Sequence, residues 1–319
     1  MFIVAENNDS FVSAAEILCD ELRNAVMSIP ESRRANIQEI RLRCGKPLVL
    51  TDGTSALFID SGGRVLYSLS DNAFRVTQRH IYDTFRRLCS YSVYSCANDI
   101  KNGFITVKGG HRAGLCGTAV VSGGKITAVN DISSIDLRIS RQITGVSEPV
   151  IKRLCPLRSG VLIAGVPSSG KTTILRDIAY RLSLGIDCKI MRTVVIDERG
   201  EISGTYSGKA YNELGLCDIM NGYPKGEGIM QAIRAMSPQV IICDELGDEK
   251  DCRSVEQGIN AGVIIIATAH ASSFEELMKR EHIGRLIRMG AFGNIVMLGT
   301  SDRPSHIEEI IDTERITGE

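Results

Sequence analysis

A segment of eight residues that joins an apolar run to a helix constrains the fold of this chain more than any other feature. It reads Gly-Val-Pro-Ser-Ser-Gly-Lys-Thr at positions 165–172 and matches the pattern G-x-x-x-x-G-K-[ST]. Glycines let backbone N–H groups turn inward around phosphate oxygens, and the N-terminus of the next helix adds the positive end of its dipole. The segment therefore predicts a strand, a phosphate-binding loop (P-loop) and a helix in that order.

The individual residues of this loop have different expected roles. The candidate nucleotide-binding residues are Gly165, Val166, Pro167, Ser168, Ser169, Gly170, Lys171, Thr172 and Thr173. We expect the Lys171 ammonium to contact the β- and γ-phosphates and the Thr172 hydroxyl to ligate Mg²⁺. The alternative is a glycine-rich structural loop. Phosphate binding is favoured because apolar residues 161–164 precede the loop and an amphipathic helix follows it.

The second half of the chain has the pattern of an α/β domain. Short, unbroken apolar runs alternate with helical segments, at residues 161–164, 193–196, 240–243, 263–267 and 295–298. Runs of this kind suit strands that crossover helices bury on both faces, so the pattern predicts a mostly parallel sheet.

The first half has a different pattern, which predicts a smaller α+β domain. A helix is expected from Ser10 to just before Pro30, and a second helix begins at the cap Thr77. Alternating or short apolar segments predict strands at residues 40–44, 56–59, 64–69, 104–107, 115–121, 125–129 and 135–139. We place the domains at residues 1–145 and 146–319, because glycine and proline interrupt both patterns near that boundary.

Two acids follow the apolar run 240–243 and form the second candidate site. If this run is a parallel strand, Asp244 and Glu245 emerge at its carboxyl end, at the edge where ligands bind in open α/β sheets. Asp244 is expected to hold Mg²⁺ through water, and Glu245 to orient or deprotonate the attacking water. The alternative is an acidic surface loop, which the preceding P-loop makes the weaker interpretation.

Two further groups follow apolar strands. Asp197, Glu198 and Glu201 could polarise a water or touch metal, and Asp197 is a candidate metal ligand; a solvated turn is the alternative. His270 could sense the γ-phosphate through its imidazole, although a histidine there can equally be a packed, hydrogen-bonded residue.

Charge and composition exclude several classes of protein. The chain of 319 residues has 37 basic and 38 acidic residues, no tryptophan and 5% aromatic residues. Nucleic acid is therefore not expected as a partner, since affinity for it needs a positive field or a stacking platform. The longest apolar run, 261–269, is about half of what a bilayer requires, and no signal peptide opens the chain. These features predict a cytoplasmic protein.

The P-loop, the acidic box 197–201, the strand ending in Asp244-Glu245, and Thr268-Ala269-His270-Ala271 follow in the order seen in type II/type IV secretion ATPases, which this chain resembles. Within that superfamily it is most similar to the stage III sporulation AA family. Further residues that carry this similarity are 170–179, 233–238, 39–43 and 109–114. Two positions depart from the secretion motors. Asp244 replaces a common glycine, and the acidic box leaves open whether Glu198 or Glu201 is functional.

The resemblance implies a RecA-like ATPase domain that uses ATP and Mg²⁺. It also implies a homo-hexameric ring in the mother cell of a spore-former, held peripherally at the membrane by a membrane-anchored subunit, where it drives or gates a channel to the forespore. Such rings supply arginines to the nucleotide, and the candidates are Arg112, Arg138 and Arg141. Two alternatives remain, a nucleic-acid-dependent P-loop ATPase and a nucleotide-gated scaffold with little turnover.

Overall fold

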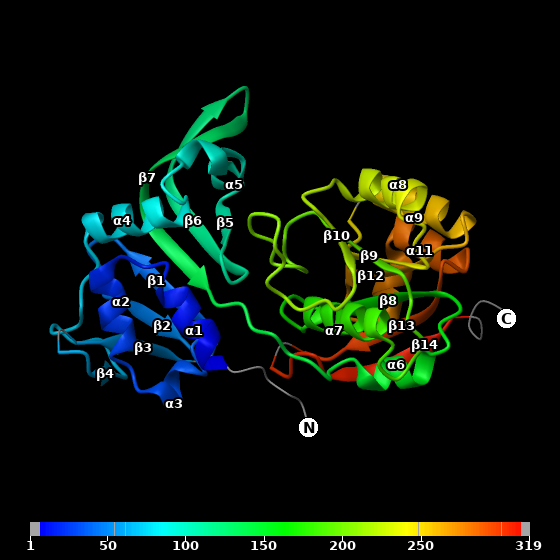
Figure 1. The fold of residues 1–319 in the computed structure, drawn as a ribbon, viewed down its shortest axis with the longest axis horizontal. Helices are drawn as coiled ribbons and strands as arrows, with labels where there is room; N and C mark the ends of the chain where they lie inside the picture. Colours follow the sequence, from blue (N-terminus) through cyan, green and yellow to red (C-terminus); the bar gives the residue numbers. More distant parts are fainter. Residues whose placement is uncertain (1–6, 54, 61, 248, 301, 314–319) are drawn as a thin grey trace. The chain divides into compact units, whose positions relative to one another are not determined.

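The chain forms two compact units (Figure 1), seen in a computed structural model that describes residues 7–53, 55–60, 62–247, 249–300 and 302–313. The N-terminal unit takes the described residues up to Gln142, together with Gly204–Tyr211. The C-terminal unit takes Ile143–Ser203 and the described residues from Asn212 onward. The return of residues 204–211 to the N-terminal unit has no counterpart in the sequence patterns.

The N-terminal unit is an antiparallel sheet with helices. Its helices are α1 (Asn7–Ala15), α2 (Asp20–Met27), α3 (Glu31–Arg34), α4 (Gln78–Leu88), the 3₁₀ helix η1 (Val93–Cys96) and α5 (Ala97–Lys101). Its strands are β1 (Glu39–Arg43), β2 (Val49–Thr51), β3 (Ala56–Ile59), β4 (Val65–Leu66), β5 (Phe104–Val107), β6 (His111–Ser122) and β7 (Lys125–Arg138). They form one seven-stranded sheet in the order β4–β3–β2–β1–β7–β6–β5. The α+β expectation for this half is confirmed.

Alternation of side chains explains how this sheet is covered. Ile40 and Leu42 of β1 are fully buried, and they belong to the same core cluster as Phe11 of α1, Leu22 of α2 and Ile81 of α4. Side chains that alternate along a strand point to opposite faces, so the helices pack on the face that carries the apolar set.

Two N-terminal predictions need correction. The single helix expected from Ser10 is two helices, because the chain is extended at Cys19, whose backbone N–H donates to Thr84 Oγ1 at 3.2 Å. The strands expected at 125–129 and 135–139 are one continuous strand, β7. The predicted cap is confirmed, since Thr77 Oγ1 accepts from the His80 N–H at the start of α4.

The C-terminal unit is the predicted α/β domain. Its helices are α6 (Glu148–Leu154), α7 (Lys171–Leu184), α8 (Lys225–Ala235), α9 (Glu249–Asn260), α10 (Phe274–Lys279) and α11 (Glu281–Arg288). Its strands are β8 (Gly160–Gly165), β9 (Thr193–Asp197), β10 (Asp218–Asn221), β11 (Val240–Glu245), β12 (Ile264–His270), β13 (Phe292–Leu298) and β14 (Ile307–Asp312). The seven-stranded sheet has the order β10–β9–β11–β12–β8–β13–β14 and is parallel except for the pair β13–β14.

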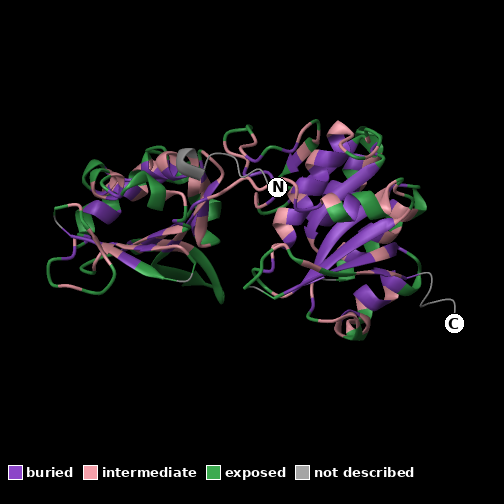
Figure 2. Cartoon of the chain, turned by 90° about the horizontal axis from the view of Figure 1, so that it is seen from below, coloured by how far each residue is buried: buried purple, intermediate pink, exposed green. Residues whose placement is uncertain are grey.

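Helices bury both faces of this sheet (Figure 2). One core cluster joins Ile241 of β11 to α8, α9 and α11, and the other joins its neighbour Ile242 to α6 and α7. All residues of β8 and β9 are buried, as the unbroken apolar runs predict. The carboxyl ends of β8, β9, β11 and β12 therefore meet at one edge of the sheet.

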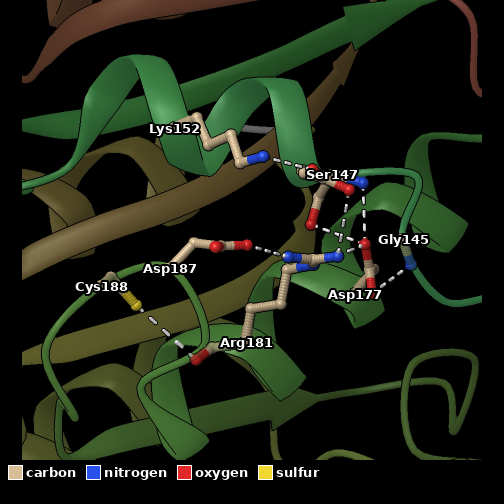
Figure 3. A network of polar contacts seen from close by, with 8 residues as sticks. Gly145, Ser147, Lys152, Asp177, Arg181, Asp187 and Cys188 are labelled. Carbon is tan, nitrogen blue, oxygen red and sulfur yellow. Dashed lines mark hydrogen bonds and ion pairs between the residues drawn. The ribbon is translucent and has the colours of Figure 1, made fainter.

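A buried carboxylate holds the helix that follows the P-loop. Asp177 of α7 is fully buried and accepts from the Gly145 N–H at 3.0 Å and from the Ser147 N–H and Oγ, both at 2.7 Å (Figure 3). Arg181 lies one turn later and contacts Asp177 at 3.3 Å and Asp187 at 2.7 Å. Because buried polar groups need partners, these hydrogen bonds hold residues 145–147 against α7.

Candidate nucleotide-binding site

The P-loop backbone has the conformation that its glycines predict. Gly170 precedes α7 with φ of +92°, and Ser168 also has positive φ, +61°. A Cβ on Gly165 would lie 2.4 Å from Ser169 Oγ, and one on Gly170 would lie 2.5 Å from the Ser305 backbone nitrogen. Both glycines are therefore required, the first by close packing and the second by conformation as well.

A hydroxyl inside the loop is left unsatisfied. Ser169 is fully buried, and its Oγ has no hydrogen-bond partner among the residues that the structure describes. Its carbonyl accepts from the Ser305 N–H at 2.7 Å, so the turn between β13 and β14 seats against the loop. A buried donor without a partner is costly, and a ligand oxygen at the loop would satisfy it. The loop thus fits a phosphate group.

The predicted phosphate-binding lysine is folded back over the loop. Lys171 Nζ donates to the carbonyl oxygens of Gly165 and Val166, both at 2.9 Å, and lies 3.0 Å from His270 Nδ1. Burial lowers the pKa of Lys171, and the nearby Glu245 carboxylate opposes that shift. These contacts keep the ammonium beside the loop, where an arriving phosphate would exchange with the carbonyls.

His270 connects Lys171 to the expected catalytic glutamate. Its Nε2 lies 3.1 Å from Glu245 Oε2, while its Nδ1 faces the ammonium. An ammonium only donates, so Nδ1 must accept, and we assign the proton to Nε2, which donates to Glu245. The register of the sheet sets this arrangement, since His270 on β12 pairs with Gly165 on β8. The structure therefore brings together Lys171, His270 and Glu245, as the sequence predicts.

The end of β11 is irregular at the two acids. The register between β11 and β12 shifts after Ile242, and pairing resumes with Glu245 opposite Thr268. An extra residue in one strand redirects side chains, which suits a functional site. Asp244 is buried, and burial raises its pKa to about 6 against the pull of Lys225. Lys225 Nζ lies 3.2 Å from Asp244 Oδ1.

The acidic box does not act as one unit. Asp197 is fully buried, and its carboxylate accepts from the Ile202 N–H at 3.2 Å, the Ser203 N–H at 2.7 Å and Ser203 Oγ at 2.6 Å. Glu198 is exposed and Glu201 is half-buried. The bonds give Asp197 a structural role in closing the turn, and its role as a metal ligand stays a prediction, as do catalytic roles for Glu198 and Glu201.

A magnesium ion fits the donors that the sequence predicts at this edge. Mg²⁺ takes oxygen ligands and keeps several waters, so one hydroxyl, one carboxylate and phosphate oxygens suffice. Thr172 at the start of α7 is half-buried and offers the hydroxyl, and Asp244 offers the carboxylate. In the described part of the chain, no cluster of three or more His, Cys, Asp or Glu could hold a metal.

The three predicted arginines all lie in the N-terminal unit. Arg112 on β6 and Arg138 on β7 are register partners, so the sheet places two of them side by side. Arg112 lies 3.7 Å from the centroid of the Phe104 ring, and Arg138 lies 4.0 Å from Glu39. Arg141 donates to the Ile37 carbonyl, which gives its guanidinium a structural partner. Their action on a nucleotide stays a prediction.

Two residues near the site were not predicted from the sequence. Arg176 of α7 donates to the Glu201 carbonyl and so joins the P-loop helix to the acidic box. Lys225 is the first residue of α8 and contacts Asp244. A lysine at a helix N-terminus opposes the helix dipole, and this conflict is the signal that could have identified it.

Comparisons with known sequences show the family to which this chain belongs. The family model described as "Sporulation stage III, protein AA" matches residues 12–317. The chain is also similar to "Stage III sporulation protein AA" of Bacillus subtilis, with 34% identity over 303 residues that cover 94% of each chain.

Solved structures of two DotB ATPases and of a pilus retraction motor share the fold. The DotB ATPase of Legionella pneumophila has a TM-score of 0.55 at 16% identity, with coverage of 93% of this chain and 80% of that one. The Yersinia pseudotuberculosis DotB ATPase has a TM-score of 0.57 at 16% identity, covering 93% and 82%. The pilus retraction motor PilT with bound ADP has a TM-score of 0.53 at 13% identity, covering 86% and 76%. At these identities the likeness shows a fold, here that of RecA-like P-loop ATPases. Among the described residues, no helix is long and apolar enough to cross a bilayer.

Proposed function

Because the chain belongs to the "Sporulation stage III, protein AA" family, we propose that it is a secretion-type ATPase that binds and hydrolyses ATP in the presence of Mg²⁺. The contact series from Lys171 through His270 to Glu245 carries this proposal. It joins the group expected on the γ-phosphate to the group expected on the attacking water, at the mouth of a P-loop with an unsatisfied hydroxyl.

The residues divide the work of hydrolysis among them. The amides of the P-loop and the Lys171 ammonium bind and orient the phosphates and stabilise the charge that develops on them. Glu245 orients the attacking water and accepts its proton. When the Lys171 ammonium moves onto the γ-phosphate, His270 Nδ1 loses its donor, which couples the presence of that group to the position of Glu245. Thr172 and Asp244 would hold Mg²⁺, which would supply positive charge to neutralise the phosphate oxygens.

The family and the shared fold also support a proposal about the wider role. We propose a homo-hexameric ring, held peripherally at the mother-cell membrane by a membrane-anchored subunit, that energises or gates a channel to the forespore. Arg112, Arg138 or Arg141 of the N-terminal unit would act on the nucleotide, in the same or a neighbouring subunit. Support comes from the sporulation relative and from ATPases with the same fold. Light scattering with and without a non-hydrolysable ATP analogue tests assembly.

Hydrolysis itself is tested with two substitutions. Lys171→Ala removes the phosphate-binding cation, and we expect it to abolish nucleotide binding and turnover. Glu245→Gln keeps the shape but removes the base, and we expect ATP binding within about twofold of wild type and turnover at least about 100-fold lower. The measurements are phosphate release at several protein concentrations and equilibrium binding of ATP.

The control is Glu227→Gln, which changes an exposed glutamate of α8 that pairs with Lys250 at the surface. It should match wild type in both measurements. Wild-type turnover equal to that of Glu245→Gln at every protein concentration, with binding retained, would favour a nucleotide-gated scaffold over an ATPase. Turnover that rises only with single-stranded DNA would favour the nucleic-acid-dependent alternative.

A further inference from the structure

A buried ammonium lies behind the two acids at the end of β11. Lys225 is 5% exposed, and its Nζ lies 3.2 Å from Asp244 Oδ1 and 3.4 Å from Asp251 Oδ2. The same ammonium donates to the Glu245 backbone carbonyl. Three donors of one lysine thus hold groups from the end of β11 and from α9, next to the predicted catalytic residues.

A charged lysine is destabilised at this position. Lys225 begins α8, where the helix dipole disfavours a positive charge, and burial removes the ammonium from water. The compensation comes from carboxylates. Asp244 and Asp251 contact the ammonium directly, and Asp197 and Glu201 add negative charge around Asp244. A cation at this point balances a cluster of acids that would otherwise repel one another.

The contact to Asp244 differs from the other polar contacts of this edge because a metal ion could replace it. A lysine ammonium is a compact point charge on a flexible stem, and Mg²⁺ is a compact charge with the same preference for carboxylate oxygen. Asp244 is the carboxylate expected to serve Mg²⁺. The Lys225 ammonium therefore pairs with the same carboxylate that is expected to bind the ion.

We propose that Lys225 is a positioning residue for Asp244, which holds this carboxylate when no divalent cation is bound and competes with Mg²⁺ for it. This inference rests on the proposed nucleotide site. It has two consequences. The end of β11, including the Glu245 backbone, keeps its position when no nucleotide is bound. The protein also binds Mg²⁺ less tightly than its acids alone would allow, so the ion exchanges together with the nucleotide.

The test compares nucleotide affinity with and without the metal. The dissociation constant of a fluorescent ADP analogue is measured in excess Mg²⁺ and in EDTA at equal ionic strength. The constant in EDTA divided by the constant in Mg²⁺ reports the coupling between Mg²⁺ and nucleotide. Lys225→Met should raise this ratio at least about fivefold, because Asp244 is released to the ion and the metal-free site loses a positive charge. Lys225→Arg keeps the charge and should stay within about twofold of wild type.

Three further variants make the result specific. Lys250→Met removes an exposed lysine of α9, 72% exposed, and should leave the ratio unchanged. Asp251→Asn removes one competitor for the ammonium, binds Lys225 more firmly to Asp244, and should lower the ratio about twofold. In an Asp244→Asn background, Lys225→Met should change the ratio by less than about twofold, because the shared partner is gone.

An unchanged ratio in folded Lys225→Met, checked by circular dichroism, would overturn the inference, and so would an equal rise in the Asp244→Asn background. If Lys225→Met does not fold, Asp251→Asn decides, and an unaltered ratio there rejects the competition. The outcomes also separate this inference from the proposed function. A wild type that couples Mg²⁺ to nucleotide without turnover rejects hydrolysis alone, whereas a wild-type ratio of one rejects the magnesium site and the role of Lys225 together.

Discussion

Two aspartates lie at or near the ends of neighbouring strands of the C-terminal sheet, and different groups compensate for the burial of their carboxylates. Asp197 ends β9 and is 0% exposed, and Asp244 lies near the end of β11 and is 9% exposed. Asp197 accepts hydrogen bonds from the backbone and hydroxyl of the turn that follows it. Asp244 instead contacts the ammonium of Lys225, from a helix that begins elsewhere in the chain.

The difference distinguishes an acid that maintains the fold from one that is available for chemistry. Backbone N–H groups cannot leave Asp197 without unfolding its turn, so we expect the loss of this carboxylate to reduce stability. A lysine side chain can move away from Asp244 and expose the oxygen to another cation. The raised pKa of Asp244, about 6, shows that the lysine does not fully offset burial. Three experiments test this distinction.

The largest expected effect is on turnover. Asp244→Asn should lower ATP hydrolysis about 1,000-fold, equivalent to about 4 kcal/mol of activation free energy, because a charged ligand for the metal is lost. Its free energy of unfolding should fall by less than that of Asp197→Asn, because Lys225 keeps Asp251 as a partner. Single-turnover hydrolysis and urea denaturation measure the two quantities. Strong destabilisation with turnover retained would reverse the roles that we assign.

The converse is expected for the acid of β9. Asp197→Asn places an NH₂ group among N–H donors, so the free energy of unfolding should fall by about 3 kcal/mol. Urea denaturation measures it, with Ser203→Ala as a milder comparison that removes one hydroxyl donor and should cost about 1 kcal/mol. If Asp197→Asn were as stable as wild type but inactive, Asp197 would be assigned as a metal ligand instead of a structural residue.

The smallest effect concerns pH. Below about pH 4, Asp244 is protonated in both folded and unfolded chains; between about pH 4 and pH 6 the unfolded chain ionises while the folded one keeps its proton. A folded pKa above the unfolded value means that this group's contribution to stability falls as pH rises through that window. The stability of wild type relative to Asp244→Asn should therefore drop by about 2 kcal/mol between these pH values. Parallel stability curves for the two proteins, measured by urea denaturation, would contradict the raised pKa.

The sequence was sufficient to identify most of the components of the candidate site. The P-loop pattern depends on local backbone geometry, and strand–loop–helix context follows from apolar runs on either side of residues 165–172. Because parallel strands end at a common edge, residues after different strands could be expected near one another. We therefore expected His270 and Glu245 on the same side of the sheet as Lys171, and in the structure His270 contacts both Lys171 and Glu245.

Other features depend on packing between distant segments and left little trace in local patterns. The break between α1 and α2 comes from a hydrogen bond between Cys19 and Thr84, which are far apart in the sequence. The short strands β2, β10 and β14 were not predicted. β2 has only three residues, and β10 and β14 lie at the edges of their sheet and bury one residue each. Lys225 gave only an indirect signal, a charge at the wrong end of a helix.

The sequence by itself determined that a phosphate-binding loop joins a buried strand to a helix, because that geometry depends on glycines and neighbours within a few residues. Only the tertiary structure decided which of the acids carries a removable cation and which is closed off by its own turn. Burial and partners set the chemistry of a carboxylate, and both come from segments that meet only when the sheet has formed.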